Sequence, residues 1–559
     1  MRRLTVLGAL LSAPLAIAGG QPAGRVPAPV SVQLLAINDF HGNLEPPSGA
    51  NGRIHMVPAG GAEYLGTHLT RAIAGNPNSI VIAAGDLIGA SPLISALSHD
   101  EPTIEAMNAM HLAVSSVGNH EFDQGPRELL RMQKGGCHPT DGCQDGDGFA
   151  GARFRYLAAN VIRAATRAPL LPPTVVRTIG GVNVGFIGET LRGTKDIVAP
   201  AGTTGLTFLD EAATANLYAA RLSRLGVHAI VLLIHEGGRQ GPDDDEADPN
   251  GCVSFSGPID AIARTLTPDI KVVISGHSHR FYNCTIAGHI VTSASSYGRM
   301  ITRLNLAIDR SSDRITSASA TNEIVTRDVA KDATQTRIIA KYGALSAGVA
   351  NKVVGSVTAD LMRKINAAGE SALGDVFADA QLAATSAPDK GGAVVAFMNS
   401  GGIRADVVAN APRATARPGE VTYGDLYTVQ PFGNVLSVIT MTGDMLKRLL
   451  EQQFDNPTPG QRTMLQVSSG FTYRYKLTAP TGRHVDADSI AINGQPVAPT
   501  DRVRVEASDF LVAGGNDFSV FGEGTNKVVG DADLDALVAY FKAHSPVAPG
   551  PQDRIVRTD

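Results

Sequence analysis

The chain has 559 residues, which excludes one small module and suits two large domains or three to four of roughly average size. Hydrophobic residues make up 43% and charged residues 18%, a composition that excludes an intrinsically disordered chain. The net charge of −5 provides no overall basic field, so we expect no nucleic-acid polymer as a partner.

The first 18 residues have the pattern of a secretory signal. Arg2 and Arg3 precede an apolar stretch, and Ala16-Ile17-Ala18 forms a small-residue cleavage site. An N-terminal membrane anchor is the weaker alternative, because the stretch is shorter than the roughly 20 residues that a spanning helix needs. The sequence therefore predicts a periplasmic or secreted protein with no membrane span after cleavage.

Eight short apolar runs lie between Ser31 and Ser296, separated by polar or glycine-containing turns and helix-like stretches. Runs of this length are typical of strands that are buried on both faces in a layered α/β domain. Because open α/β sheets bind ligands at the carboxyl ends of their strands, we expect the polar residues there to converge on one cleft. The runs are VQLLAIND, SIVIAAGDLI, AVSSVGNHEF, YLAANVI, VNVGFIGET, HAIVLLIHE, KVVISGHSH and IVTSAS.

Four cysteines are present in a chain that is predicted to reach an oxidising compartment. Their even number indicates two disulfides, for which three pairings exist. We favour Cys137 with Cys143, which share one Gly- and Asp-rich loop, and Cys252 with Cys284. A zinc site is the weaker alternative, because no pair has the two-residue spacing of a thiolate knuckle.

A change of pattern divides the chain after the eight runs. Residues 326–354 carry apolar residues at helical spacing without a strand signal, which predicts a connecting helix. Residues 355–559 mix helical segments such as Asp444–Phe454 with strands such as Val394–Met398. We therefore predict an α/β domain over residues 30–325 and a second, α+β domain after the helix.

The polar residues that end the predicted strands form a set of oxygen and nitrogen donors without thiolates. Such a mixture suits divalent metals of intermediate softness, namely Zn, Mn, Co or Fe(II). One histidine after a strand is more often structural, but five such motifs in order indicate a metal centre. The candidates are Asp39 and His41 in NDFHGN, Asp86 in GDLIGAS, Asn119 and His120 in GNHEFD, His235 in LLIHEGG, and His277 and His279 in SGHSH.

The succession D-x-H, G-D, G-N-H-E-F-D, H and G-H-x-H resembles the calcineurin-like metallophosphoesterase family. The motifs NSGGIR (Asn399–Arg404), QPFGN (Gln430–Asn434) and FLVAGGNDF (Phe510–Phe518) resemble the C-terminal domain of secreted 5'-nucleotidases. That group also includes UDP-sugar hydrolases and 2',3'-cyclic nucleotide phosphodiesterases. The resemblance covers nearly all of the mature chain. It implies a four-layer α/β/β/α domain, a connecting helix and a smaller α+β domain.

The resemblance implies two divalent metal ions that share Asp86. It also implies that His120 faces the substrate phosphate and that Asp123 orients His120. A carboxylate on one ring nitrogen favours the charged imidazolium, which can stabilise the transition state. The implied ligands are Asp39, His41, Asp86 and His279 for the first ion, and Asp86, Asn119, His235 and His277 for the second.

The same resemblance implies a nucleoside pocket in the second domain. Phe432 and Phe510 would stack on the two faces of a base, an interaction that tolerates different bases. Arg404 would donate hydrogen bonds to ribose or phosphate oxygens, and Asn399 would meet the base edge or the sugar. Rotation of one domain against the other is also implied, with a hinge near Ala350–Val354.

The sequence departs from the family pattern in two places. Where relatives often have Gly-Gly-Asp-Gly, this chain has Gly514-Gly515-Asn516-Asp517, so either Asn516 or Asp517 takes the ribose-binding position. The segment Glu370–Asp375 lacks the arginine that some relatives use for substrate contact.

These observations predict an exported, monomeric hydrolase that releases phosphate from nucleoside 5'-monophosphates. Activity toward UDP-sugars or 2',3'-cyclic nucleotides is left open. A thiosulfohydrolase of sulfur oxidation is one alternative, but the aromatic motifs at Phe432 and Phe510 favour a nucleotide substrate. A non-catalytic nucleoside-binding surface protein is another alternative. It is disfavoured because every expected ligand position holds a residue that can bind a metal.

Overall fold

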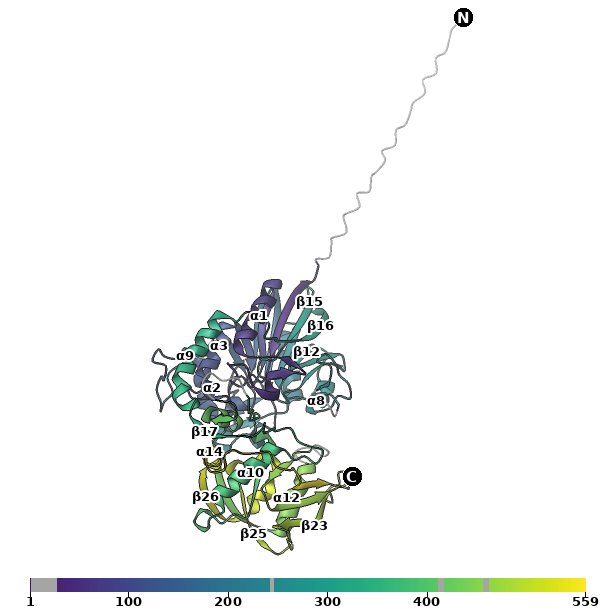
Figure 1. The fold of residues 1–559 in the computed structure, drawn as a ribbon. Helices are drawn as coiled ribbons and strands as arrows, with labels where there is room; N and C mark the ends of the chain where they lie inside the picture. The colour runs from purple at the N-terminus through teal and green to yellow at the C-terminus, as the bar shows by residue number, and fades with distance from the viewer. Residues whose placement is uncertain (2–27, 242–245, 411–416, 456–461) are drawn as a thin grey trace.

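Figure 1 shows that the first half of the chain forms one body and the second half forms another that packs against it. The predicted signal, residues 1–18, lies outside the described residues apart from Met1. In the parts of the chain that are described, no helix is both long and apolar enough to cross a membrane. The computed structural model describes Met1 and residues 28–241, 246–410, 417–455 and 462–559.

Two six-stranded sheets form the centre of the first body. Strand β1 (Val30–Ile37) pairs in parallel with β4 and antiparallel with β15, so its sheet is mixed. Its side chains alternate: Val32 and Leu34 pack between the sheets, whereas Leu35 packs on the outer face. The first sheet has the order β16 (Ile315–Ile324), β15 (Met300–Ile308), β1, β4 (Ser79–Ala84), β5 (Leu112–Ser116) and β6 (Arg155–Leu157). The second sheet has the order β13 (Phe281–Ile286), β14 (His289–Ala294), β12 (Ile270–Ser275), β11 (Ala229–His235), β9 (Val182–Thr190) and β8 (Thr174–Ile179).

Helices cover the outer faces of both sheets, which gives four layers. One apolar cluster joins the first sheet to α1, α3 and α4, another joins the second sheet to α7 and α8, and a third fills the space between the sheets. The predicted α/β/β/α architecture is confirmed. The covering helices are α1 (Ala62–Gly75), α3 (Glu101–Ala109), α4 (Gly125–Lys134), α7 (Glu211–Arg224) and α8 (Pro258–Thr265).

All eight predicted runs contribute strands, and YLAANVI divides between β6 and β7 (Val161–Arg163). Strand β7 pairs with β10 (Leu206–Phe208) outside the two large sheets. The antiparallel strands β8, β13, β15 and β16 were not among the predicted runs. Strand β16 shows why: its sequence ITSASATNEI is half exposed and contains no apolar run.

Helix α9 (Ala333–Ala350) is shorter than the predicted connecting helix over residues 326–354. Its start is fixed by the Asp332 carboxylate, which accepts hydrogen bonds from the backbone N–H groups of Thr334 and Gln335. The chain then enters β17 (Val353–Ser356), which pairs with β19 (Glu420–Thr422).

The second body contains a five-stranded and a four-stranded sheet with helices packed around them, as an α+β domain requires. The larger sheet has the order β21 (Leu465–Val467), β18 (Val395–Asn399), β25 (Arg502–Ser508), β20 (Val435–Thr442) and β26 (Thr525–Ala532), and the smaller has the order β24 (Gln495–Pro496), β23 (Val485–Ile492), β22 (Phe471–Tyr475) and β27 (Ile555–Arg557). Its helices are α10 (Ala372–Thr385), α11 (Tyr423–Val429), α12 (Gly443–Asp455) and α14 (Asp533–His544).

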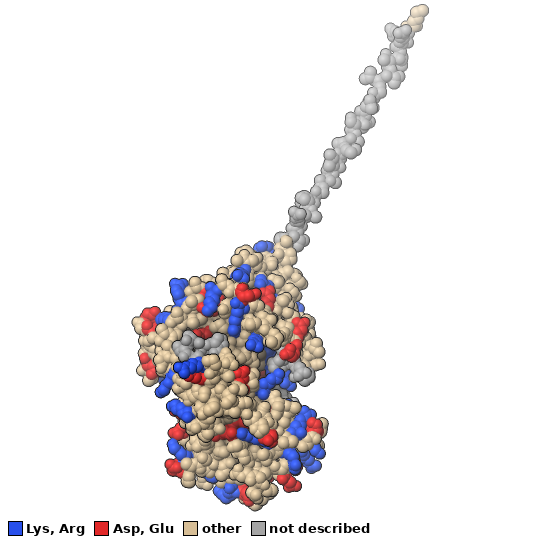
Figure 2. Space-filling view, in the orientation of Figure 1, with Lys and Arg blue, Asp and Glu red and all other residues tan. Residues whose placement is uncertain are grey.

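Both favoured disulfides are present, Cys137 with Cys143 and Cys252 with Cys284. On the face drawn in Figure 2, Lys and Arg side chains are interspersed with Asp and Glu, in keeping with the small net charge. Short elements complete the fold: β2 (Arg53–Ile54), β3 (Val57–Pro58), α2 (Leu93–Ala96), α5 (Thr194–Ile197), α6 (Pro200–Thr203) and α13 (Asp509–Val512).

Candidate metal centre and adjoining cavity

The candidate metal ligands lie together at the carboxyl ends of five strands. Several have backbone φ angles in the left-handed region, including Asp39 at 50°, His41 at 47° and Asp86 at 49°. For residues other than glycine this region costs about 1–3 kcal/mol each, and such strain clusters at functional sites. Asp39 and His41 follow β1, Asp86 follows β4, Asn119 follows β5, His235 ends β11, and His277 and His279 follow β12.

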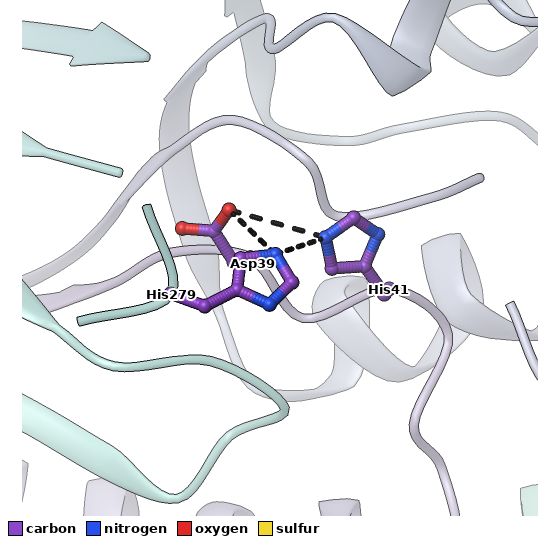
Figure 3. A group of neighbouring side chains, drawn as sticks. All are labelled: Asp39, His41 and His279. Atoms are coloured by element: carbon purple, nitrogen blue, oxygen red, sulfur yellow. Dashed lines mark hydrogen bonds and ion pairs between the residues drawn. The ribbon is translucent and has the colours of Figure 1, made fainter. Parts of the chain in front are cut away.

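Asp39, His41 and His279 form a first group of converging side chains (Figure 3). The Nε2 atoms of His41 and His279 are 3.0 Å apart. Oδ1 of Asp39 lies 3.3 Å from Nε2 of His279 and 3.9 Å from Nε2 of His41. One oxygen and two nitrogens thus face a common point.

Asp86, His235 and His277 form a second group, and Asn119 lies beside it. Nε2 of His235 is 2.9 Å from Oδ2 of Asp86, and Nδ1 of His277 is 3.0 Å from Oδ1 of Asn119. The same Asp86 oxygen is 3.6 Å from Nε2 of His41 in the first group. Asp86 therefore lies between the two groups, at the position that a bridging ligand takes.

The hydrogen bonds of two imidazoles show that the donor set fits metal ions. Nδ1 of His41 lies 2.8 Å from the carbonyl oxygen of Gly89, and Nδ1 of His235 lies 2.8 Å from that of Ala84. Because carbonyl oxygens only accept hydrogen bonds, both Nδ1 atoms carry a proton, so each ring can bind a metal only through Nε2, once that nitrogen has no proton. Lone pairs facing carboxylate oxygens repel each other unless a cation lies between them.

The electrostatic environment favours the metal-binding protonation states of most of these ligands. His235 is the exception: burial would lower its pKa, but the charges of Asp86 and Asp39 outweigh this effect and raise it to about 10, so an ion that binds there displaces a proton. Burial lowers the pKa of His41 and of His279 well below the ordinary value of imidazole. Burial, with the charge of His235, lowers the pKa of His277 to about 4. Burial alone would raise the pKa of Asp86, but the charge of His235 outweighs it and holds this pKa well below its usual range. Neutral imidazoles and an ionised carboxylate are the ligating forms.

His120 lies beside the second group and is paired with Asp123. Its Nδ1 donates a hydrogen bond to Oδ2 of Asp123 at 2.7 Å, and its backbone N–H donates to Oδ1 of Asp86 at 2.9 Å. Burial would lower the pKa of His120, but the charges of Asp123 and Asp86 outweigh this effect and raise it. The ring is therefore held in one orientation with its protonated form favoured.

Two buried residues that support the site were missed by the sequence prediction. The carboxylate of Glu121 accepts hydrogen bonds from the backbone N–H groups of Asp86 and Leu87, both at 2.9 Å. The amide of Asn38 donates to Oδ2 of Asp39 at 2.6 Å. Both residues stand within the motifs NDFHGN and GNHEFD, directly beside a candidate ligand, and that adjacency is the signal that could have found them.

A cavity of about 510 Å³ adjoins these groups and extends between the two bodies. It also reaches residues that the prediction did not include, such as His99, Met132, Val198 and Tyr427. The predicted residues that line it are Asn119, His120, Asp123, His277, Asn399, Arg404, Phe432, Phe510 and Asn516.

Phe432 of the second body lies directly against His120 of the first. Their ring centroids are 5.7 Å apart and their planes differ by 24°. The guanidinium carbon of Arg404 lies 5.8 Å from the centroid of the Phe432 ring. Nε of Arg404 is buried and has no hydrogen-bond partner among the described residues. A residue that lines the cavity thus has a hydrogen-bond donor without a protein partner.

The loop that follows β25 shapes the opposite wall. The Asn399 amide donates to Oδ1 of Asn516 at 3.1 Å, and the ring of Phe510 lies against Gly515. Gly514, Gly515 and Asp517 are not among the described residues that line the cavity. Of the two alternatives for the ribose position, Asn516 is therefore the one whose side chain the structure places at the cavity.

Two family matches cover the two bodies in the same order. Residues 32–281 match the calcineurin-like phosphoesterase family, and residues 348–523 match the 5'-nucleotidase C-terminal domain. The chain belongs to the 5'-nucleotidase family of calcineurin-like phosphoesterases. The predicted resemblance and the prediction of a hydrolase are both confirmed.

Relatives of this phosphoesterase extend over most of its length. It is 32% identical over 536 residues to "Endonuclease YhcR" of Bacillus subtilis, covering 94% of this chain and 41% of that protein. It is also 32% identical to "Cell wall protein Lmo0130" of Listeria monocytogenes, covering 92% of this chain and 67% of that protein. This chain thus spans less than half the length of the Bacillus relative.

Among solved structures, a 5'-nucleotidase precursor from Thermus thermophilus has the same two-body fold as this phosphoesterase. The TM-score is 0.75 at 25% identity, and the match covers 94% of this chain and 99% of the other. Because the match includes both bodies, the pairing of a metallophosphoesterase domain with the second domain is a property of the family fold. Family membership and the side-chain groups described above agree on a divalent-metal phosphoesterase.

Proposed function

We propose that this phosphoesterase is an exported nucleotide phosphohydrolase that releases phosphate from nucleoside 5'-monophosphates. The observation that carries the proposal is one cavity lined both by Asn119 and His277 of the metal-ligand groups and by the aromatic rings of Phe432 and Phe510. A cavity of about 510 Å³ is of the size that small-molecule substrates occupy. Phosphate at one end and a base at the other would use both sets of residues.

Two divalent ions, drawn from Zn, Mn, Co and Fe, fit the two side-chain groups. The first would be held by Asp39, His41 and His279, the second by Asn119, His235 and His277, and Asp86 would be shared. When bound, such a pair supplies Lewis-acid chemistry that activates water and neutralises the charge of an in-line displacement.

The chain's own residues then orient the substrate and stabilise charge. The protonated ring of His120, held by Asp123 at 2.7 Å, donates from Nε2 to a phosphoryl oxygen. The unpartnered Nε of Arg404 donates to a phosphate or ribose oxygen. Phe432 and Phe510 exclude water and stack on the base.

Specificity for the sugar and the base is assigned to the second domain. Asn399 and Asn516, which hydrogen-bond each other at 3.1 Å in the cavity wall, meet the ribose or the base edge. Gly514, with a φ of 90°, allows the chain to turn, Gly515 lets it pass closely beneath Phe510, and Asp517 follows in the same loop. Turnover of UDP-sugars or 2',3'-cyclic nucleotides belongs to the same proposal.

Export and domain organisation complete the proposal. Two disulfides support an oxidising compartment, periplasmic or extracellular, and the signal pattern of residues 1–18 would direct the chain there. The monomer would consist of a catalytic domain over residues 30–325 and a substrate domain over 355–559. A hinge at Ala350–Val354 would join them.

The test is phosphate release by metal-loaded protein from a panel of substrates. The panel contains AMP, UDP-glucose, 2',3'-cyclic AMP, p-nitrophenyl phosphate and a single-stranded oligonucleotide, the last because one relative is named as an endonuclease. We expect AMP to be hydrolysed with the highest kcat/KM and the oligonucleotide to be left intact. Equal rates on AMP and p-nitrophenyl phosphate would contradict the base-binding role of the second domain.

Two substitutions test the catalytic assignment. Asp86→Ala removes the shared ligand and His120→Ala removes the phosphate-facing imidazole, so both should abolish measurable turnover. His544→Ala, which removes an exposed histidine of α14, is the control and should retain wild-type rates. Unchanged turnover in Asp86→Ala or His120→Ala would show that the chemistry takes place elsewhere.

A further inference from the structure

A second cluster of metal-binding side chains lies outside the candidate active site. It consists of His99, His138 and Asp141, whose ligand atoms all lie within 4.8 Å of one another. Oδ2 of Asp141 is 2.8 Å from Nε2 of His99 and 3.3 Å from Nδ1 of His138. One carboxylate oxygen therefore faces a nitrogen of each ring.

These separations are close to the edges of a metal coordination shell. Metal–nitrogen and metal–oxygen bonds to zinc are about 2.0–2.2 Å, so neighbouring ligand atoms of a tetrahedral site lie roughly 3.3–3.6 Å apart. The 3.3 Å pair of His138 and Asp141 has this spacing, and the 2.8 Å pair of His99 and Asp141 has to lengthen by about half an ångström. The His99 and His138 rings are stacked, with centroids 3.7 Å apart and planes 13° from parallel. This stacking keeps both rings beside the same Asp141 oxygen.

A disulfide fixes the loop that carries two of the three side chains. Cys137 and Cys143 flank His138 and Asp141 and are bonded to each other. Within this loop the backbone N–H of Gly142 donates to the carbonyl oxygen of His138 at 2.9 Å. The two ligands are thus held in place before any ion arrives, which reduces the entropic cost of binding.

The same loop is anchored a few residues further on. Lys341 of α9 contacts Asp145 at 2.7 Å and Asp147 at 3.0 Å. These two carboxylates thus share the single positive charge of Lys341 and tie the loop to α9. Two contacts would have to change when an ion binds: the 3.3 Å hydrogen bond from the Asp141 N–H to Nδ1 of His138, and the 2.8 Å hydrogen bond between Nε2 of His99 and Oδ2 of Asp141.

We propose that His99, His138 and Asp141 bind a third divalent transition-metal ion, of the class of Zn²⁺. Two imidazoles and one carboxylate suit zinc and its neighbours and suit calcium or magnesium poorly. The side chains are 24%, 20% and 44% exposed, so the ion is reached from solvent and water completes its shell. Because His99 lines the large cavity, the ion lies at the cavity's wall.

The test counts bound zinc in the full-length protein. Wild type, His138→Ala, Asp141→Asn and the control His544→Ala are stripped with a chelator, dialysed against buffered Zn²⁺ and assayed for zinc per chain. We expect His138→Ala and Asp141→Asn each to bind one ion fewer than wild type, and His544→Ala to bind the same number. Asp141→Asn retains the shape of the side chain, and circular dichroism checks that each variant is folded.

The difference between the wild type and the variants decides the proposal, and the absolute count does not. A wild type that binds three ions, with two in His138→Ala, supports both this site and the dinuclear centre. Counts of one and zero would support this site while contradicting the dinuclear centre. Equal counts in wild type, His138→Ala and Asp141→Asn would overturn the third site whatever the number.

Discussion

Gly515 lies beneath the ring of Phe510, and a methyl group there should displace the ring. A Cβ added to Gly515 would stand 2.5 Å from Cζ and 2.6 Å from Cε1 and Cε2 of Phe510, closer than real side-chain atoms approach. The ring borders the cavity, so it can move away into open space. Gly515→Ala therefore changes the position of Phe510 without removing it.

The expected cost follows from the stacking that the ring would provide. Stacking of one aromatic side chain on a base is worth about 1–3 kcal/mol, and each 1.36 kcal/mol is a factor of ten. We therefore expect kcat/KM for AMP to fall about 5- to 150-fold, mainly through KM, because stacking contributes equally to ground state and transition state. Hydrolysis of p-nitrophenyl phosphate, which has no base, should be unchanged.

A double-mutant cycle with Phe510→Ala tests the reasoning. Phe510→Ala alone should lower kcat/KM for AMP by a similar factor. If Gly515→Ala acts only through the ring, adding it to Phe510→Ala should have no further effect. Additive losses of kcat/KM in the double variant, or an equal loss with p-nitrophenyl phosphate, would refute the idea that Gly515 acts by positioning the ring of Phe510.

Three further predictions concern the His120 pair, a buried acid and a disulfide. Asp123→Asn preserves shape but removes the charge that favours the protonated ring of His120, so steady-state kinetics should show kcat for AMP lower by about 100-fold. Burial raises the pKa of Asp533 from its ordinary value of 3.8 to about 7. Between about pH 4 and pH 7 the folded protein therefore keeps a proton on this carboxyl that the unfolded chain has lost. Stability should therefore fall as pH rises from about 4 to 7, and urea unfolding should show Asp533→Asn gaining up to about 3 kcal/mol relative to wild type between pH 5 and 8. Replacing Cys252 and Cys284 by serine opens a loop with a sequence separation of 32, and thermal or urea unfolding should report a loss of about 4 kcal/mol.

The metal-ligand groups were predictable because each is local to a buried strand. Asp39 and His41 follow β1 by two and four residues, and His235 is the last residue of β11. Buried parallel strands are visible in the sequence as apolar runs, and their carboxyl ends meet at one edge of the sheet. Sequence order and topology were therefore sufficient to bring the side chains together.

Features that depend on how the domains meet were not predictable in this way. The contact of Phe432 with His120 joins residues 312 positions apart, and no local pattern specifies it. The half-exposed edge strands, such as β16, lack apolar runs because only part of each strand is buried. The cluster of His99 and Asp141 arises from a loop that contacts the segment before α3 and is tied to α9 by Lys341, and no periodicity in the sequence encodes these contacts.

The position of Phe432 has a consequence for how substrate binding is coupled across the two domains. Its ring stacks beside the imidazole of His120 at a centroid distance of 5.7 Å, next to the side chain that is proposed to face the phosphate. On the proposed function, the phosphate binds beside His120 and the base stacks on Phe432, so both contacts form at neighbouring rings of the two domains. A nucleotide makes the phosphate contact and the stacking contact with one molecule, whereas a simple phosphate ester gains no stacking. On the proposed function, we therefore expect part of the selectivity for nucleotides over simple phosphate esters to come from stacking on a ring that also borders the phosphate-facing histidine.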